Sequence, residues 1–203
     1  FLEFVVELAA PTDRIATVVG DDPLLRLHDV DLDPPVSRPS GLGLVVRDGA
    51  RRAEAEALVV DMRSRVDELV AGADPSAGLS FYYELDDTFY SATSKTFIGQ
   101  LFELLGLANI ADPAGKGSGG YPQLSAEYII EADPDLIFLA DTKCCGQSPE
   151  TVAERPGWDE IAAATNGGVV PLDEDVAQRW GPRVGDLLGE IAAAAETAEA
   201  AAA

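Results

Sequence analysis

The sequence has few of the residues that build covalent or metal frameworks. Its 203 residues include only two cysteines, the adjacent Cys144 and Cys145, which cannot link distant segments, so the fold must rest on its hydrophobic core. We favour a turn that holds two small apolar thiols; a soft-metal site and a strained vicinal disulfide are the alternatives. His28 is the only histidine, so neither a His-based metal site nor a Ser-His-Asp triad is predicted.

Basic residues and long apolar runs are also scarce. The chain has 14 Lys and Arg against 36 Asp and Glu, a net charge of −22 that repels phosphate backbones and argues against nucleic-acid binding. We interpret this charge as a source of solubility, as in proteins from salt-rich habitats. No apolar run approaches the ~20 residues that span a bilayer. The opening FLEFVVELAA carries Glu3 and Glu7 and has no basic flank, so an export signal is expected upstream of Phe1.

The order of apolar segments predicts an α/β fold. Residues 50–72 have helical apolar spacing and end at Gly72, which predicts one long helix. From Leu79 onward, β-rich runs alternate with capped helices, which predicts a mainly parallel sheet sandwiched by helices. Residues 1–49 form short apolar pieces between Asp, Pro and Gly clusters and are too few for an independent lobe. We therefore expect three parts: residues 1–49, the helix at 50–72, and an α/β lobe at 73–203.

The expected helix and strand ends lie at specific residues. Ser94 and Ser125 are predicted to cap two helices, a further helix to begin at Pro156, and the last helix to begin at Pro182. The sequence GKGSGG at 115–120 matches the glycine spacing of a dinucleotide-binding motif. That motif follows a strand and opens a helix, whereas here no apolar strand precedes it and Tyr-Pro follows it, so we predict a loop.

Three acids follow one predicted strand, among aromatic residues. Glu84, Asp86 and Asp87 could serve as the paired carboxylates of a glycan hydrolase. We favour a strand end with solvated acids and with the rings of Tyr82, Tyr83, Phe89 and Tyr90 facing the core.

Other rings and charges belong to predicted loops. Tyr121, Trp158 and Trp180 offer flat contact area for a bulky ligand; for Trp158, packing onto the core is at least as good an interpretation. Asp175 and Arg179 lie four residues apart and could hold a polar ligand edge or form a surface ion pair.

Three segments together resemble a known family. They are FYYELDDTFYSATSKTFIGQLFELLGLANI, GGYPQLSAEYIIEADPDLIFLAD and RPGWDEIAAATNGGVVPLDEDVAQRWGPRV. With the long helix before them, they resemble the class III substrate-binding proteins of ABC importers, which include cobalamin-binding and iron-siderophore-binding proteins. The resemblance covers residues 54–191.

The resemblance implies two α/β lobes joined by a spine helix, here residues 50–72, with the ligand in the cleft between them. Because only 49 residues precede the spine, the first lobe would be reduced. By position, Tyr121, Asp175 and Arg179 match ligand-facing residues of the second lobe. We expect Trp180 to form an aromatic wall for the ligand together with Tyr121. Glu127 matches the acid that pairs with permease arginines.

The resemblance therefore implies an extracytoplasmic solute-binding component, in the periplasm or lipid-anchored at the cell surface. It would bind a ligand such as cobalamin or a ferric siderophore or haem, dock to the ABC permease, catalyse no reaction and need no cofactor; we expect a monomer. A one-lobed docking module without solute binding, or a glycan hydrolase, are the alternatives.

Overall fold

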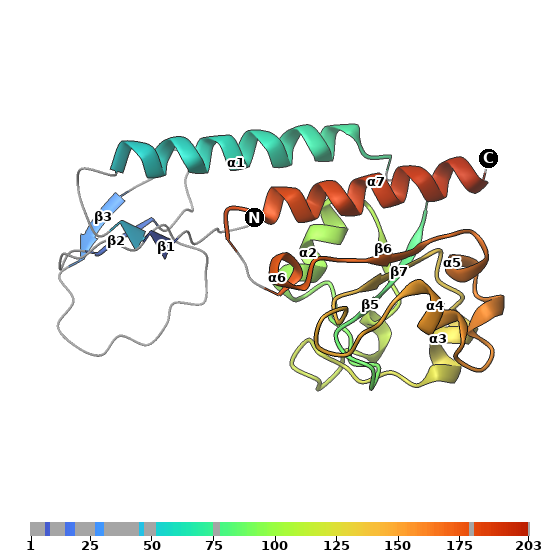
Figure 1. The fold of residues 1–203 in the computed structure, drawn as a ribbon. Helices are drawn as coiled ribbons and strands as arrows, with labels where there is room; N and C mark the ends of the chain where they lie inside the picture. Colours follow the sequence, from blue (N-terminus) through green and yellow to red (C-terminus); the bar gives the residue numbers. More distant parts are fainter. Residues whose placement is uncertain are drawn as a thin grey trace. The chain divides into compact units, whose positions relative to one another are not determined.

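The chain divides into two compact units, which we describe separately (Figure 1). One comprises Phe1–Arg65 with Trp180–Val184, and the other Val66–Arg179 with Gly185–Ala203. The computed structural model describes residues 7–8, 15–18, 27–30, 45–46, 52–74, 78–178 and 181–202. The first unit contains a four-stranded mixed sheet of order β1-β4-β2-β3. Its strands are β1 (Glu7–Leu8), β2 (Ile15–Val18), β3 (Leu27–Val30) and β4 (Val45–Val46). Whether residues 1–49 are the remnant of a lobe stays a prediction.

The predicted long helix is present as α1 (Arg52–Gly72). Its buried residues are Ala55, Val59, Met62 and Val66, which recur at the spacing of one helical face. Leu58 is only half-buried, and the smaller Ala55 and Val59 take the buried positions.

The second unit is built on a four-stranded parallel sheet of order β6-β5-β7-β8. Its strands are β5 (Ser80–Glu84), β6 (Ala108–Asn109), β7 (Leu136–Leu139) and β8 (Val169–Pro171). The predicted α/β class with a mainly parallel sheet is confirmed. Strand β6 was not predicted, because two residues are too short for a periodic signal.

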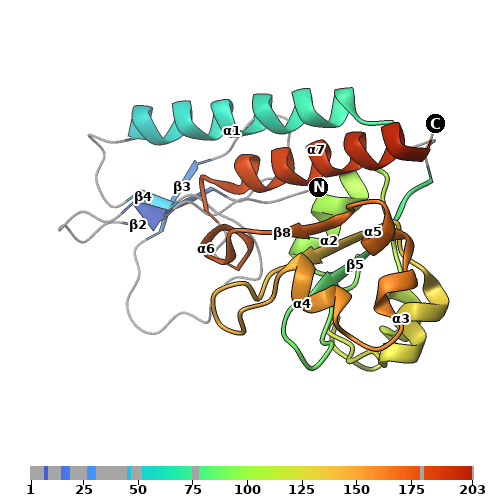
Figure 2. The same cartoon turned by 45° about the vertical axis from the view of Figure 1, so that its right-hand side comes forward.

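Helices cover both faces of this sheet, and the strand residues alternate between them. Tyr82 and Ile137 face a core formed with α3 (Ala126–Ala132), α4 (Pro149–Ala153) and α5 (Ala162–Thr165). Phe81 and Phe138 point to the other face, where they contact Phe102 of α2 (Phe97–Leu104) at ring-centroid distances of 4.1 and 4.9 Å. Figure 2 shows α7 (Val184–Ala202) on the opposite side of the sheet from α3 and α4.

The helix ends correct two of the predictions. The N-cap of α2 is Thr96 and not Ser94, because the Thr96 hydroxyl accepts the Gly99 N–H at 3.1 Å while the Ser94 N–H donates to Asp112. A Cβ at Gly99 would lie 2.1 Å from the Thr93 carbonyl oxygen, so this turn requires glycine.

No helix begins at Pro156. The segment instead contains α4, which starts at Pro149 behind a Ser148 capping box, and then η4 (Trp158–Glu160) and α5. Ser125 does cap α3, as predicted, and α7 begins at Val184, two residues after Pro182. The glycine-rich segment 115–120 is a loop of turns, as expected. The remaining short helices are η3 (Asp112–Ala114) and α6 (Glu174–Ala177).

Candidate functional site

The candidate site lies at the carboxyl edge of the second unit's sheet. Strands β5, β7 and β8 end at Glu84, Leu139 and Pro171, so the segments that follow them emerge at the same edge. Parallel α/β sheets bind their ligands at this edge. We call residues 85–93, 140–148 and 172–178 the carboxyl-edge segments. A hollow of about 400 Å³ is lined largely by residues near the strands' amino ends and by alanines of α7, and no predicted site residue lines it.

Two exposed tyrosines belong to paired backbone segments at this edge. The Ser91 N–H donates to the Pro122 carbonyl at 2.9 Å, and the Thr93 N–H donates to the Gly120 carbonyl at 2.8 Å. This pairing carries Tyr90 and Tyr121, whose exposed fractions are 40% and 41%. Burial raises the pKa of Tyr83, near the end of β5, and electrostatic interaction with Tyr121 raises it further.

The expectation that the rings in β5 and in the segment after it face the core is only partly right. Tyr82 and Tyr83 are buried, and Phe89 packs against the core, but Tyr90 is exposed. Sequence reasoning therefore missed Tyr90 as a candidate ligand contact. The available signal was its position beside Asp86 and Asp87, in a turn that cannot be wholly buried.

The other two carboxyl-edge segments are bound to each other. The Lys143 ammonium lies 2.7 Å from Asp173 and 2.7 Å from Asp175. The backbone N–H groups of Lys143 and Cys144 both donate to the Glu174 carboxylate, at 2.8 and 2.9 Å. Asp175 is thus at the predicted edge, where it pairs with Lys143, 32 residues away, a contact that local sequence spacing could not reveal.

The structure describes only part of the predicted site. Tyr121 and Asp175 both belong to segments bound to the carboxyl edge, whereas Arg179 and Trp180 lie outside the described residues. Trp158 is 1% exposed, so the core interpretation is correct for that ring.

Glu127 is exposed in the first turn of α3, as expected for a residue that meets a partner. Hydrogen bonds with its own backbone and with Ser125 lower its pKa, so its carboxylate is charged at neutral pH. The helix dipole also stabilises an acidic side chain in the first turn, and this structural role is compatible with contact to a partner.

Beneath the edge lies a buried ion pair. Glu84 is fully buried, and both of its carboxylate oxygens accept hydrogen bonds from Arg155, at 2.7 and 2.6 Å. Arg155 also donates to Gln147 at 2.7 Å and lies over the ring of Trp158, 4.5 Å from its centroid. Such bidentate pairing fixes the guanidinium plane as well as its charge. The expectation of a solvated acid is wrong for Glu84, because strand alternation turns it toward the Trp158 core.

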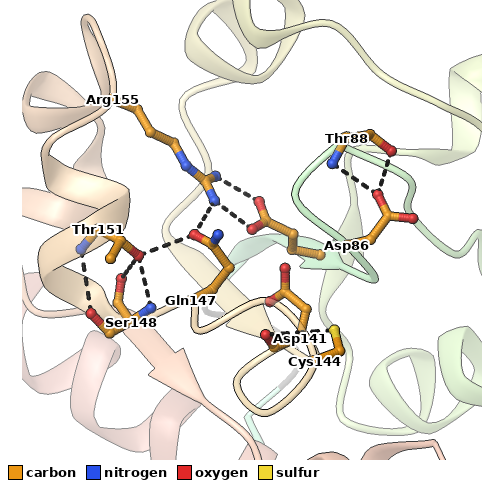
Figure 3. A network of polar contacts seen from close by, with 9 residues as sticks. Asp86, Thr88, Asp141, Cys144, Gln147, Ser148, Thr151 and Arg155 are labelled. Carbon is orange, nitrogen blue, oxygen red and sulfur yellow. Dashed lines mark hydrogen bonds and ion pairs between the residues drawn. The ribbon is translucent and has the colours of Figure 1, made fainter.

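A second buried acid stands beside this pair. Asp141 is fully buried, and neither of its carboxylate oxygens has a hydrogen-bond partner. Burial and the charge of Glu84 raise the pKa of Asp141 to about 7. Figure 3 shows Asp141, Gln147 and Arg155 close together under the edge. We call Glu84, Asp141 and Arg155 the buried acid cluster; Arg155 pairs with Glu84, and the Asp141 carboxyl group has no such partner.

This geometry does not support the glycan-hydrolase alternative. Glycan hydrolysis needs two carboxyl groups that reach one substrate from solvent. Glu84 is buried and ion-paired, and Asp86 fixes a turn by accepting hydrogen bonds from the N–H and hydroxyl of Thr88. Among the residues described, no group of three or more His, Cys, Asp and Glu is arranged to hold a metal ion.

Comparison with known proteins defines the class. The sequence profile of the family described as "Periplasmic binding protein" matches residues 50–176, and this chain belongs to that family. The structure of a possible iron-binding periplasmic solute-binding protein of Staphylococcus epidermidis superposes with a TM-score of 0.60 at 25% identity, over 71% of this chain and 56% of that one. The vitamin B12 binding protein BtuF of Vibrio cholerae, at 22% identity, shares the fold with a TM-score of 0.58, over 73% of this chain and 56% of that one.

Two curated relatives narrow the comparison. The chain is 33% identical over 145 residues to a cobalamin-binding protein of Halobacterium salinarum, and 26% identical over 149 residues to YvrC, an ABC transporter substrate-binding lipoprotein of Bacillus subtilis. These matches cover 69% and 71% of this chain, but 38% and 45% of the relatives, so the chain spans less than half of their length. The predicted resemblance is therefore confirmed. Within the described part of the chain, no helix is both long and apolar enough to cross a membrane.

Proposed function

We propose that this protein is the extracytoplasmic solute-binding component of an ABC importer and that it binds a bulky ligand without catalysing a reaction. The observation that carries the proposal is the pair of exposed tyrosines on hydrogen-bonded segments at the carboxyl edge. Exposed rings held by a rigid backbone provide apolar contact area at little cost in conformational entropy. Family membership supports the class of function.

The ligand that we propose is a large ring-bearing or chelated solute: cobalamin, or a ferric siderophore or haem. Tyr90 and Tyr121 would contact its apolar surface. The ion-paired groups of Lys143 and Asp175 would meet its polar edge. Cobalamin is the first ligand to test, because the Halobacterium relative is named for binding it.

Replacing Tyr121 by alanine is expected to weaken cyanocobalamin binding about tenfold, because the lost ring contact is worth about 1 to 2 kcal/mol. Isothermal titration calorimetry measures this change. Tyr121→Phe keeps the ring and should bind nearly as well as the unaltered chain. Val60→Ala alters an exposed apolar residue of α1 and serves as the control for unspecific loss. Equal affinities for Tyr121→Ala and the unaltered chain would remove Tyr121 from the site.

Glu127 is proposed to dock the protein on its permease. Glu127→Lys is expected to weaken binding to the purified permease in nanodiscs at least tenfold, because an attraction to arginine becomes a repulsion. The solute affinity should not change. Glu131→Lys makes the same charge change at an exposed residue of the same helix and is the matched control. If both variants lose docking equally, net charge and not Glu127 governs it.

The one-lobed docking module is the second candidate, because docking through the exposed Glu127 needs no bound solute. It is distinguished by the same measurements. Permease binding together with flat titrations against cobalamin, haem and ferric siderophores would favour it.

A further inference from the structure

The adjacent thiols Cys144 and Cys145 lie in the turn that follows β7, at the carboxyl edge. They are not joined by a disulfide; Cys144 is exposed and Cys145 half-buried. The Cys144 thiol lies 3.8 Å from the Asp141 carbonyl oxygen, and interaction with the Cys145 side chain, together with desolvation, raises the pKa of Cys144 to about 12. The buried acid cluster and the solute-binding proposal make no use of this dithiol.

The turn around the thiols is held by a few hydrogen bonds to two acids. The carbonyl oxygen of Asp141 accepts the N–H groups of Cys145 and Gln147, at 3.2 and 3.4 Å. The Glu174 carboxylate accepts the N–H groups of Lys143 and Cys144. Lys143, which directly precedes the two cysteines in this turn, also forms an ion pair with Asp175.

We propose that Cys144 and Cys145 are a reversible oxidation site that closes to a vicinal disulfide, and that closure rearranges the carboxyl-edge turn. Adjacent α-carbons are about 3.8 Å apart across a trans peptide, below the usual range for disulfide-linked residues. The bond is therefore strained. Strained and exposed disulfides are easily reduced, which is the property of a switch and not of a structural link.

The oxidant for the step is a small-molecule disulfide. The thiolate of one cysteine attacks a sulfur of the oxidant, forming a mixed disulfide and releasing one thiol. The second cysteine then attacks the protein sulfur of that mixed disulfide and releases the other thiol. The cysteines lose two electrons and two protons, and the oxidant becomes two thiols. The raised pKa of Cys144 makes it the poorer nucleophile, and exchange is faster in alkali, where more thiolate is present.

Closure has a consequence for the neighbouring segment. The small ring through the peptide bond restricts the backbone angles of both cysteines, so the hydrogen bonds of their N–H groups to Glu174 and Asp141 must change. Lys143 then shifts relative to Asp173 and Asp175. Oxidation thus alters the polar half of the carboxyl edge, while the Tyr90 and Tyr121 pairing is unaffected.

The test equilibrates the full chain with a series of reduced and oxidised glutathione mixtures at pH 8, without solute. Intact mass spectrometry and peptide mapping should find one monomeric product that lacks two hydrogen atoms, has its link within the peptide that holds both cysteines, and is reversed by dithiothreitol. Two glutathione adducts, disulfide-linked dimers, or unchanged thiols at the most oxidising mixture would each overturn the proposal.

Amide hydrogen exchange of the oxidised chain tests the structural consequence. Exchange rates should change within 141–147 and 173–178 and stay constant within 118–124. The double variant Cys144→Ser/Cys145→Ser, treated identically, should show no change. Constant rates at 141–147 after ring closure would overturn the coupling to the edge. These readouts need no ligand, so their outcome is independent of the solute-binding proposal.

Discussion

Replacing Arg155 by methionine is expected to lower the free energy of unfolding by about 3 to 5 kcal/mol, because the variant keeps a buried carboxylate and removes its partner. Glu84 is fully buried, and both of its oxygens accept from Arg155. Methionine approximates the length of the arginine side chain and can still pack on Trp158. The loss in unfolding free energy therefore reports the removal of the charge and not of the packing. Urea denaturation at pH 7 measures it.

Three further variants separate the causes. Arg155→Lys keeps the charge but cannot form the bidentate pair. Its free energy of unfolding should lie between those of the unaltered chain and Arg155→Met. Adding Glu84→Gln to Arg155→Met removes the unpaired charge and should recover much of the loss. Lys95→Met, at an exposed position of the same unit, should have little effect. If Arg155→Met costs no more than Lys95→Met, the ion pair does not contribute to stability.

Replacing Asp141 by asparagine is expected to stabilise the protein at pH 8, by about 1 to 3 kcal/mol after allowance for screening, and to have little effect near pH 4. The folded pKa of Asp141 is about 7, well above that of an ordinary aspartate. At a pH between the pKa of an ordinary aspartate and that of folded Asp141, the folded state keeps a proton that the unfolded state has lost. This group therefore reduces stability progressively as the pH rises from about 4 to about 7. Asparagine does not ionise, so its advantage grows over the same range.

The experiment compares denaturation midpoints of the two proteins from pH 4 to pH 9. Asp159→Asn makes the same charge change at an exposed position and is the control, with a difference that should vary little with pH. A difference between Asp141→Asn and the unaltered chain that is constant over the range would show that Asp141 does not titrate near neutrality.

Local patterns were sufficient for most of the second unit's fold. The β-rich run of β5, the apolar run of β7 and the alternation of strands with helices predicted a parallel sheet, because strands of such a sheet are buried on both faces. The errors came where local alternatives were nearly equal. Ser94 and Thr96 are both good caps for α2, and only a tertiary contact, that of Ser94 with Asp112, decides between them.

The candidate site was less accessible to sequence reasoning. Tyr121 and Glu127 were located through the resemblance, and their exposure matches the expectation. The contacts of Glu84 with Arg155 and of Asp175 with Lys143 join residues 71 and 32 positions apart, and no local spacing predicts such pairs. Tyr90 was misjudged because composition alone does not show which ring of a cluster faces the solvent.

The backbone pairing of residues 91–93 with 120–122 has a consequence for how binding preference can evolve. The segments are held by main-chain groups, which every amino acid except proline provides in full. Side chains at 90 and 121 can therefore be exchanged over evolutionary time with little penalty to folding. The same independence makes position 90 or 121 a natural attachment point for a solvent-sensitive dye, which would convert the protein into a reporter of its own solute.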